Sequence, residues 1–169
     1  MNPARILASL TPVLFAVLFV MIANLPVTVT AGLVPAPLLA LAPIYFWVIV
    51  RPGLMPPVAV LLVGLFEDLL SGGPPGIWAT GFLAAYGLAD RQREVFAGLS
   101  GIGAILSFAA AVFTAAGAAY LLASIVYWRP APLPSLLLES VVTVVLYPLV
   151  AIPLGWAHRN LVGAFRGDG

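Results

Sequence analysis

The sequence predicts an all-α integral membrane protein, organised as a single six-helix transmembrane bundle. Hydrophobic residues make up 63% of the 169 positions, charged residues make up 8%, and the mean hydropathy is +1.14. A soluble domain usually carries about 25% charged residues, so this chain has too few charges to cover a water-facing surface. A spanning helix needs about 20 apolar residues, which leaves room for five or six spans and no extramembrane domain.

The first three spans are expected to follow one another closely. An apolar run after Arg5 forms the first; we interpret it as a span and not as a cleaved signal peptide, because the rest of the chain is also built of spans. The second ends in the aromatic stretch Tyr45-Phe46-Trp47 beside Arg51, which is typical of a membrane interface. The third begins with Pro56 and Pro57, which a first helical turn tolerates. The expected ranges are 6–23, 33–50 and 54–70.

The last three spans differ in length. The fourth is short and ends at the most polar segment of the chain, Asp90 to Glu94, which must lie in water. The fifth is longer than a bilayer requires, so we expect it to tilt, to extend beyond the bilayer, or to break near Gly101 and Gly103. The sixth contains Glu139 and two prolines and leads into a basic tail. The expected ranges are 77–89, 95–128 and 133–156.

The positions of the arginines predict the orientation. With six spans, Arg129 is the single basic residue on one side, and all the others fall on the opposite side. Positive residues are enriched in cytoplasmic loops, so both termini are expected in the cytoplasm, and Arg129, Glu67 and Asp68 near the outer face. The residues on the cytoplasmic side are Arg5, Arg51, Arg91, Arg93, Arg159 and Arg166.

Several classes of function are not expected. A net charge of +1 leaves no basic surface for nucleic acid, and the absence of Cys excludes thiol chemistry. With His158 as the single histidine, one chain cannot build a multi-His metal site. Gly98-Leu99-Ser100-Gly101 resembles the Gly-x-Ser-Gly motif of rhomboid intramembrane proteases, and His158 could complete a dyad. We do not favour this interpretation because no polar residues suited to an oxyanion site accompany the motif, and we expect no enzyme activity and no cofactor.

The most informative stretch runs from Gly64 to Trp78. An apolar run meets Glu67 and Asp68, and a loop of Ser, Gly and Pro follows before the next apolar run. Gly and Pro in tandem end a helix and favour a tight reversal, so the stretch predicts a membrane hairpin. A carboxylate in lipid is costly and needs a partner or a function. The candidate residues of this hairpin are Glu67, Asp68, Ser71, Gly72, Pro74 and Gly76.

The carboxylates allow three interpretations. Glu67 and Asp68 lie about 100° apart on a helix, so we expect one to face the bundle and the other to reach the headgroups. Arg129 is the natural partner for Asp68 or for Glu139, which lies about two turns into the last span. The group is interpreted as a structural ion pair or hydrogen-bond lock, as a binding site or protein interface, or as a proton or ion relay.

Two further features could contact other proteins. Small residues recur at every fourth position of the fifth span, which indicates either close packing within the bundle or a docking surface for another membrane protein. In the charged inner loop, Arg91 and Arg93 could dock a cytoplasmic partner. The small residues are Gly103, Ser107, Ala111, Ala115, Ala119 and Ala123.

The hairpin pattern Gly64-x-x-x-Asp68-x-x-Ser71-Gly72-x-Pro74-x-Gly76 resembles the rod shape-determining protein MreD family. Pro43 with Tyr45-Phe46-Trp47 and Arg51-Pro52 looks like that family's second span and turn, and Leu146-Tyr147-Pro148 looks like its last span. The chain departs from the family in having Glu67 before the aspartate and Pro75 where leucine is common.

The resemblance implies a non-catalytic scaffold subunit of the bacterial cell-elongation complex, in the inner membrane. The implied partners are MreC, the actin-like MreB, the polymerase RodA, a penicillin-binding transpeptidase and membrane lipids. The implied fold is similar to the substrate-binding subunits of energy-coupling-factor transporters. A small-molecule or vitamin binding subunit of such a transporter is therefore the alternative function.

Overall fold

The computed structural model describes residues 3–25, 36–130 and 132–162. Every regular element in these ranges is helical, and no strand occurs in them. Arg166 and most of the loop expected at residues 24–32 lie outside them. The elements are α1 (Pro3–Ala23), α2 (Leu41–Val50), η1 (Pro52–Leu54), α3 (Pro57–Ser71), α4 (Ile77–Arg91), α5 (Arg93–Ala97), α6 (Ile102–Tyr127), α7 (Leu133–Ala157) and the π-helical turn η2 (His158–Val162).

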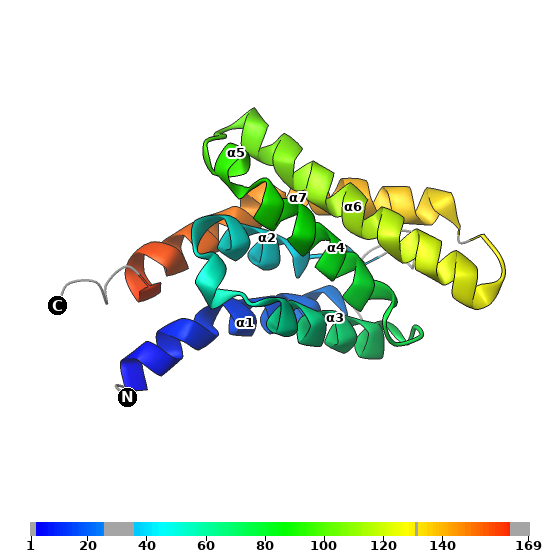
Figure 1. The fold of residues 1–169 in the computed structure, drawn as a ribbon, viewed down its shortest axis with the longest axis horizontal. Coiled ribbons are helices and arrows are strands. Elements are labelled where there is room, and N and C mark those ends of the chain that lie inside the picture. The colour runs from blue at the N-terminus through cyan, green and yellow to red at the C-terminus, as the bar shows by residue number, and fades with distance from the viewer. Residues whose placement is uncertain (1–2, 26–35, 131, 163–169) are drawn as a thin grey trace.

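The longer helices run back and forth between two ends of an elongated molecule (Figure 1). The start of α1, the η1 turn, the connection from α4 to α5 and the end of α7 gather at one end, which we call the terminal end. The turn between α3 and α4 and the connection between α6 and α7 lie at the opposite end, which we call the hairpin end. Arg51 and Arg91 therefore lie at the terminal end, and Arg129 follows α6 at the hairpin end.

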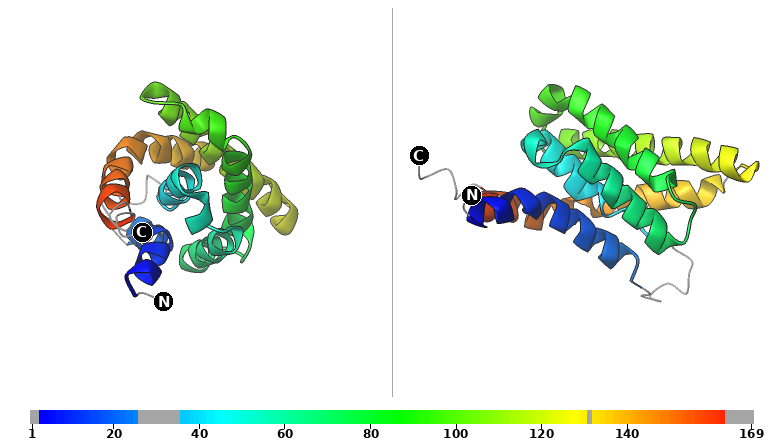
Figure 2. Two further views of the ribbon diagram at one scale, coloured as in Figure 1. Left: turned by 60° about the vertical axis from the view of Figure 1, so that its left-hand side comes forward. Right: turned by 60° about the horizontal axis from the view of Figure 1, so that its bottom comes forward.

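Helix α2 occupies the centre of the bundle, surrounded by the other helices (Figure 2). Seven of its 10 residues are buried, among them Trp47, which is fully buried. The helix expected over residues 33–50 begins only at Leu41, because residues 36–40 are not helical; residues 33–35 lie outside the described residues. Ten helical residues extend only about 15 Å, half of the roughly 30 Å of a hydrocarbon core.

Proline explains the late start of α2. Pro37 lies in the non-helical segment, and Pro43 lies in the first turn of α2, where its missing N–H removes no helical bond. One backbone group of this segment without a helical partner is satisfied by a neighbour, because the Leu38 N–H donates to Thr143 Oγ1 of α7 at 2.9 Å. Leu38 is 1% exposed, so protein shelters the segment at this position.

The long fifth segment breaks, as expected, near Gly101. Gly101 adopts φ 57° and ψ −123°, a backbone conformation that residues other than glycine rarely adopt. Helix α5 ends at Ala97 and α6 begins at Ile102. Gly103, the second expected position, lies within α6 without interrupting it.

Helix α4 packs between α3 and α6, and two glycines permit this packing. A Cβ on Gly64 of α3 would lie 2.4 Å from the Ala79 Cα, and a Cβ on Gly81 of α4 would lie 2.8 Å from the Ala115 carbonyl oxygen. Along the small-residue stripe of α6, five positions are buried: Ser107, Ala111, Ala115, Ala119 and Ala123. The stripe is therefore used for packing within the chain, and more of it is covered than the drift of the pattern around a helix indicated.

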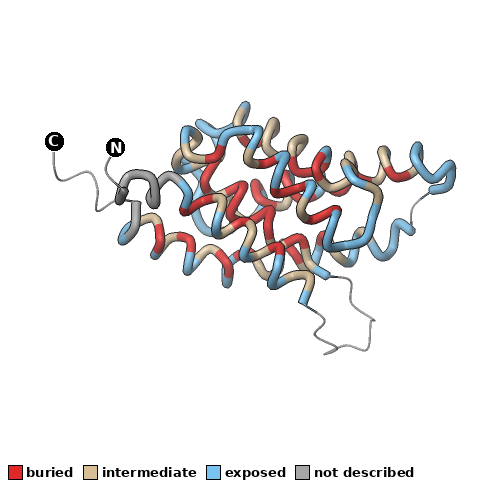
Figure 3. The backbone as a smooth tube through the Cα atoms, turned by 90° about the horizontal axis from the view of Figure 1, so that it is seen from below, coloured by how far each residue is buried: buried red, intermediate tan, exposed pale blue. Residues whose placement is uncertain are grey.

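Buried and exposed positions alternate along the helices (Figure 3), and many of the exposed positions carry large apolar side chains. Helix α6 and the segment Leu133–Asn160 are each long and apolar enough to cross a membrane. Helices α1, α3, α4 and α7 lie within a few residues of the expected ranges. Large side chains that point outward include Leu62, Leu69, Leu106, Leu121, Ile125, Val145, Leu149 and Ile152, each more than 60% exposed.

Candidate functional site

The Asp68 carboxylate closes the α3–α4 hairpin by binding the first backbone N–H groups of α4. Its Oδ2 accepts from the Gly76 N–H at 2.7 Å and the Ala79 N–H at 3.3 Å, and its Oδ1 accepts from the Trp78 N–H at 2.7 Å. The first N–H groups of a helix have no helical partner, and a carboxylate there also opposes the positive end of the helix dipole. Asp68 is 1% exposed, so this interaction replaces contact with water completely.

The turn residues give the chain the shape that this bond requires. Gly72 ends α3 at φ 70°, and Gly76 precedes α4 at φ 109°, both in the region that favours glycine. The Ser71 hydroxyl donates to the Asp68 carbonyl oxygen at 3.2 Å, which holds the last turn of α3. Pro74 lies in the loop, where it donates no backbone hydrogen bond and limits φ. All five motif residues therefore contribute to one hydrogen-bonded turn between α3 and α4, which we call the Asp68 lock. They are Asp68, Ser71, Gly72, Pro74 and Gly76.

Glu67 points to the other side of α3, toward α1. Its Oε1 accepts from Asn24 Nδ2 at 2.9 Å, and the same amide group donates to the Val20 carbonyl oxygen. Glu67 is 5% exposed, and its Oε2 has no hydrogen-bond partner among the described residues. The expectation that one of the two adjacent acids reaches the headgroups is wrong. Both are buried because α1 and α4 flank α3 and each offers donors.

Asn24 is a residue of this site that the sequence analysis missed. It follows the apolar run of α1 directly and is the first amide after it. A single polar side chain at the end of an apolar helix is a signal for a buried hydrogen bond, but only the fold shows that Asn24 contacts Glu67. Its bond ties α1 to α3, as Asp68 ties α3 to α4.

Arg129 does not form the expected ion pair with Asp68 or Glu139. Arg129 is exposed, and it makes no salt bridge within the part of the chain that the structure describes. Asp68 is occupied by backbone N–H groups and needs no cation. Glu139 is partly buried on α7, and no cation among the described residues pairs with it.

A polar pair lies inside the aromatic core near α2. The Tyr45 hydroxyl and Ser107 Oγ share a hydrogen bond of 2.6 Å between α2 and α6. The Tyr147 ring stacks on Phe108 at 4.0 Å and meets Tyr45 edge-on at 6.0 Å. The cluster joins three helices and explains why an aromatic stretch that resembles an interfacial belt is instead largely buried.

His158 is packed, although its position indicated a solvated tail. Its ring lies 5.7 Å from Trp47 and 6.3 Å from Phe46, because η2 continues α7 and brings the residue back against α2. Ser100 is exposed in the break before α6 and forms no hydrogen bond with His158. No catalytic Ser–His pair is formed between these two described residues.

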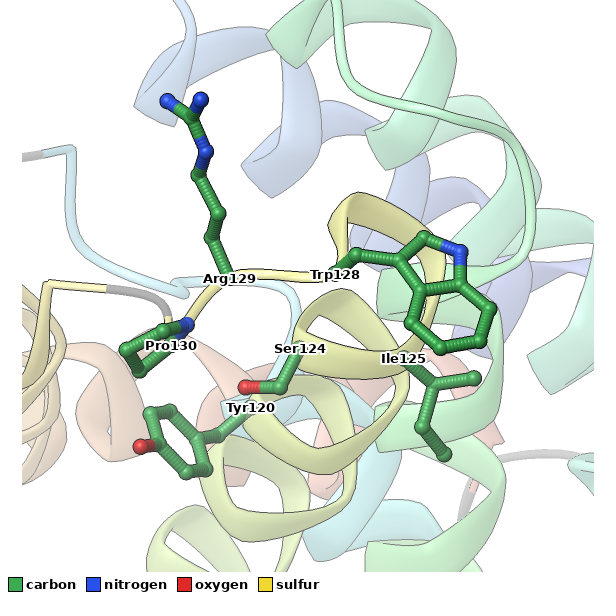
Figure 4. Close-up of a pocket in the computed structure, with 6 residues that line it drawn as sticks. All are labelled: Tyr120, Ser124, Ile125, Trp128, Arg129 and Pro130. Carbon is green, nitrogen blue, oxygen red and sulfur yellow. The ribbon is translucent and has the colours of Figure 1, made fainter.

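Two surface hollows lie at opposite ends of the bundle. At the terminal end, Asp90, Arg91, Arg93 and Glu94 surround a polar hollow of about 340 Å³. At the hairpin end, a groove of about 620 Å³ follows the last turns of α6 (Figure 4). The described residues contain no group of three or more His, Asp or Glu side chains that could hold a metal ion.

In comparisons with known proteins, the chain matches no family model, no curated protein and no solved structure. Its function must therefore be argued from the residues and their geometry.

Proposed function

We propose that the chain forms a six-crossing bundle in a bacterial inner membrane, with the terminal end in the cytoplasm. Two helices have the length and hydropathy of spans, and the outward side chains of α3, α6 and α7 are apolar. The short α2 is compatible with this placement because non-helical backbone is tolerated at membrane depth where protein buries it. The distribution of arginines between the two ends follows the positive-inside rule.

Within that membrane, the chain acts as a non-catalytic scaffold subunit of the cell-elongation machinery, as its resemblance to the MreD family implies. The observation that carries this proposal is the Asp68 lock. Every fixed residue of the resembling pattern, from Gly64 to Gly76, contributes to the hairpin of α3 and α4. A carboxylate held by three backbone N–H groups is not free to relay protons or ions. The hairpin therefore serves to present a fixed surface to partners.

The implied partners divide between the two ends. MreC, RodA and the penicillin-binding transpeptidase would contact the bundle within the membrane and at the hairpin end. MreB is cytoplasmic, and the exposed Arg91 and Arg93 offer it a polar contact at the terminal end. A surface of mixed charge gives specificity to such a contact more than affinity.

Crosslinking and co-purification from native membranes test the proposal. Wild-type protein should recover MreC and RodA, whereas recovery of an ATPase transport module would favour the vitamin-binding alternative and contradict ours. Changing Arg91 and Arg93 together to glutamate should lower recovery of MreB about tenfold, because the hollow of mixed charge then becomes entirely acidic and loses both of its basic groups. Recovery of MreC and RodA should not change.

The matched control for this variant is Arg159→Glu. Arg159 is also exposed and lies at the terminal end, beyond α7. A loss of MreB recovery that is equal in the two variants would show that net charge, and not the hollow between α4 and α5, decides the contact.

A further inference from the structure

The groove at the hairpin end combines an unpaired cation with exposed apolar side chains. It is lined by Tyr120, Ser124, Ile125, Trp128, Arg129 and Pro130. Arg129 makes no ion pair with any described residue, and the buried Ser124 Oγ has no hydrogen-bond partner among them. The Ser124 and Tyr120 hydroxyls lie on the same side of α6 as Pro130, and the Arg129 guanidinium extends away beyond the helix end (Figure 4).

The apolar part of the groove is exposed in an unusual way. Trp128 is 91% exposed and Ile125 is 66% exposed. Trp128 also has φ 53°, and it is the only non-glycine residue with a positive φ in the described chain. A bulky residue in this region is uncommon and requires support from its surroundings. Here the conformation ends α6 and presents the indole beside the groove. A ligand that covers the indole would bury its exposed apolar surface, which favours binding.

We propose that this groove binds an anionic phospholipid of the outer leaflet. The proposal rests on the membrane placement given above. Arg129 would pair with the phosphate, which lies beyond the end of α6 where the guanidinium extends. Trp128 and Ile125 would pack on an acyl chain. The volume of about 620 Å³ is large enough for the headgroup and the start of the chains.

The spacing along α6 fits the depth of a lipid headgroup. Ile125 lies four residues before Arg129, which corresponds to about 6 Å along the axis. Each interfacial layer of a bilayer is about 5–8 Å thick. With Arg129 at the phosphate level, the exposed Ile125 therefore falls near the boundary where the acyl chains begin. Tryptophan is enriched at this level for the same reason.

Native mass spectrometry of the detergent-solubilised protein tests the proposal, with phosphatidylglycerol and phosphatidylcholine of identical acyl chains as probes. Wild-type protein should retain phosphatidylglycerol in preference. Arg129→Gln should weaken that binding about fivefold, since one arginine near a membrane surface contributes about this much. Trp128→Ala should weaken binding of both lipids, because it removes an acyl-chain contact and not the charge. Circular dichroism checks that the variants keep their helix content.

Arg159→Gln is the control, because it removes one exposed arginine from the opposite end. Retention of phosphatidylglycerol by this variant, together with its loss from Arg129→Gln, supports the groove. Equal retention of the two lipids by wild-type protein would overturn the proposal, as would equal losses in the two arginine variants. Co-purification of MreC with Arg129→Gln is measured in parallel, so that failure of lipid binding is distinguished from failure of the scaffold function.

Discussion

Replacing Asp68 with alanine is expected to destabilise the protein by about 3–5 kcal/mol. The carboxylate accepts three backbone N–H groups at the start of α4. Each buried N–H that loses its partner costs about 1–3 kcal/mol, and these costs are not additive. The thermal unfolding midpoint in detergent should therefore fall by roughly 10 °C. The unfolding midpoint of Asp68→Asn should lie between those of wild-type protein and Asp68→Ala. The amide oxygen can still accept a hydrogen bond, while the NH₂ group faces backbone donors.

The control for Asp68 is Asp90→Ala. Asp90 is an aspartate of α4 itself, near the end of the helix, and forms no hydrogen bond within the described residues. Its replacement should shift the midpoint little. If Asp68→Ala had the same unfolding midpoint as Asp90→Ala and wild-type protein, the lock would contribute nothing to stability and the account of the hairpin would be wrong.

Replacing Gly64 with alanine is expected to cost about 1–3 kcal/mol, because the added methyl group overpacks a close helix contact. Its Cβ would lie 2.4 Å from the Ala79 Cα, which belongs to the backbone and cannot rotate away. Helices α3 and α4 would have to separate, and the bonds from α4 to Asp68 would lengthen with them. The measurement is the same unfolding midpoint, followed by size-exclusion chromatography to detect a loosened bundle.

Gly87→Ala provides the matched comparison for Gly64. Gly87 lies in α4, and a Cβ there would meet nothing within 4 Å. Alanine is a better helix former than glycine by up to about 1 kcal/mol, so this variant should be unchanged or more stable. Equal destabilisation by the two substitutions would show that the effect does not come from the α3–α4 contact.

The hairpin could be predicted from sequence because its signals are local. Gly72, Gly76 and Pro74 interrupt two apolar runs, and no other structure accommodates them so readily. The partner of Asp68 could not be predicted in the same way. Arg129 is the obvious opposite charge in the sequence, whereas the actual partners are backbone N–H groups, which every residue except proline carries.

Helix α2 shows the limit of hydropathy. Its segment is as apolar as a span, but apolar composition does not distinguish a helix that crosses a bilayer from one enclosed by other helices. The prolines at 37 and 43 were visible in the sequence and indicated an irregular start. That the segment is held by Thr143, more than a hundred positions away, depends on the tertiary arrangement alone.

The orientation of Glu67 has a similar cause. Adjacent helical residues point in different directions, which was expected, but which neighbour lies in each direction is a property of the bundle. In the structure α1 and α4 flank α3, so Glu67 meets Asn24 and Asp68 meets the start of α4. One of the two acids was expected at the headgroups, but both are buried.

The most direct test of the whole account is labelling of single cysteines with a membrane-impermeant maleimide in intact spheroplasts. The chain contains no Cys, so each introduced thiol reports one position. Gly73→Cys, in the exposed loop of the hairpin, should be labelled from outside, and Gln92→Cys, in the exposed turn between α4 and α5, only after permeabilisation. Labelling of both positions from the same side would contradict the proposed bundle, with its locked hairpin at the outer face.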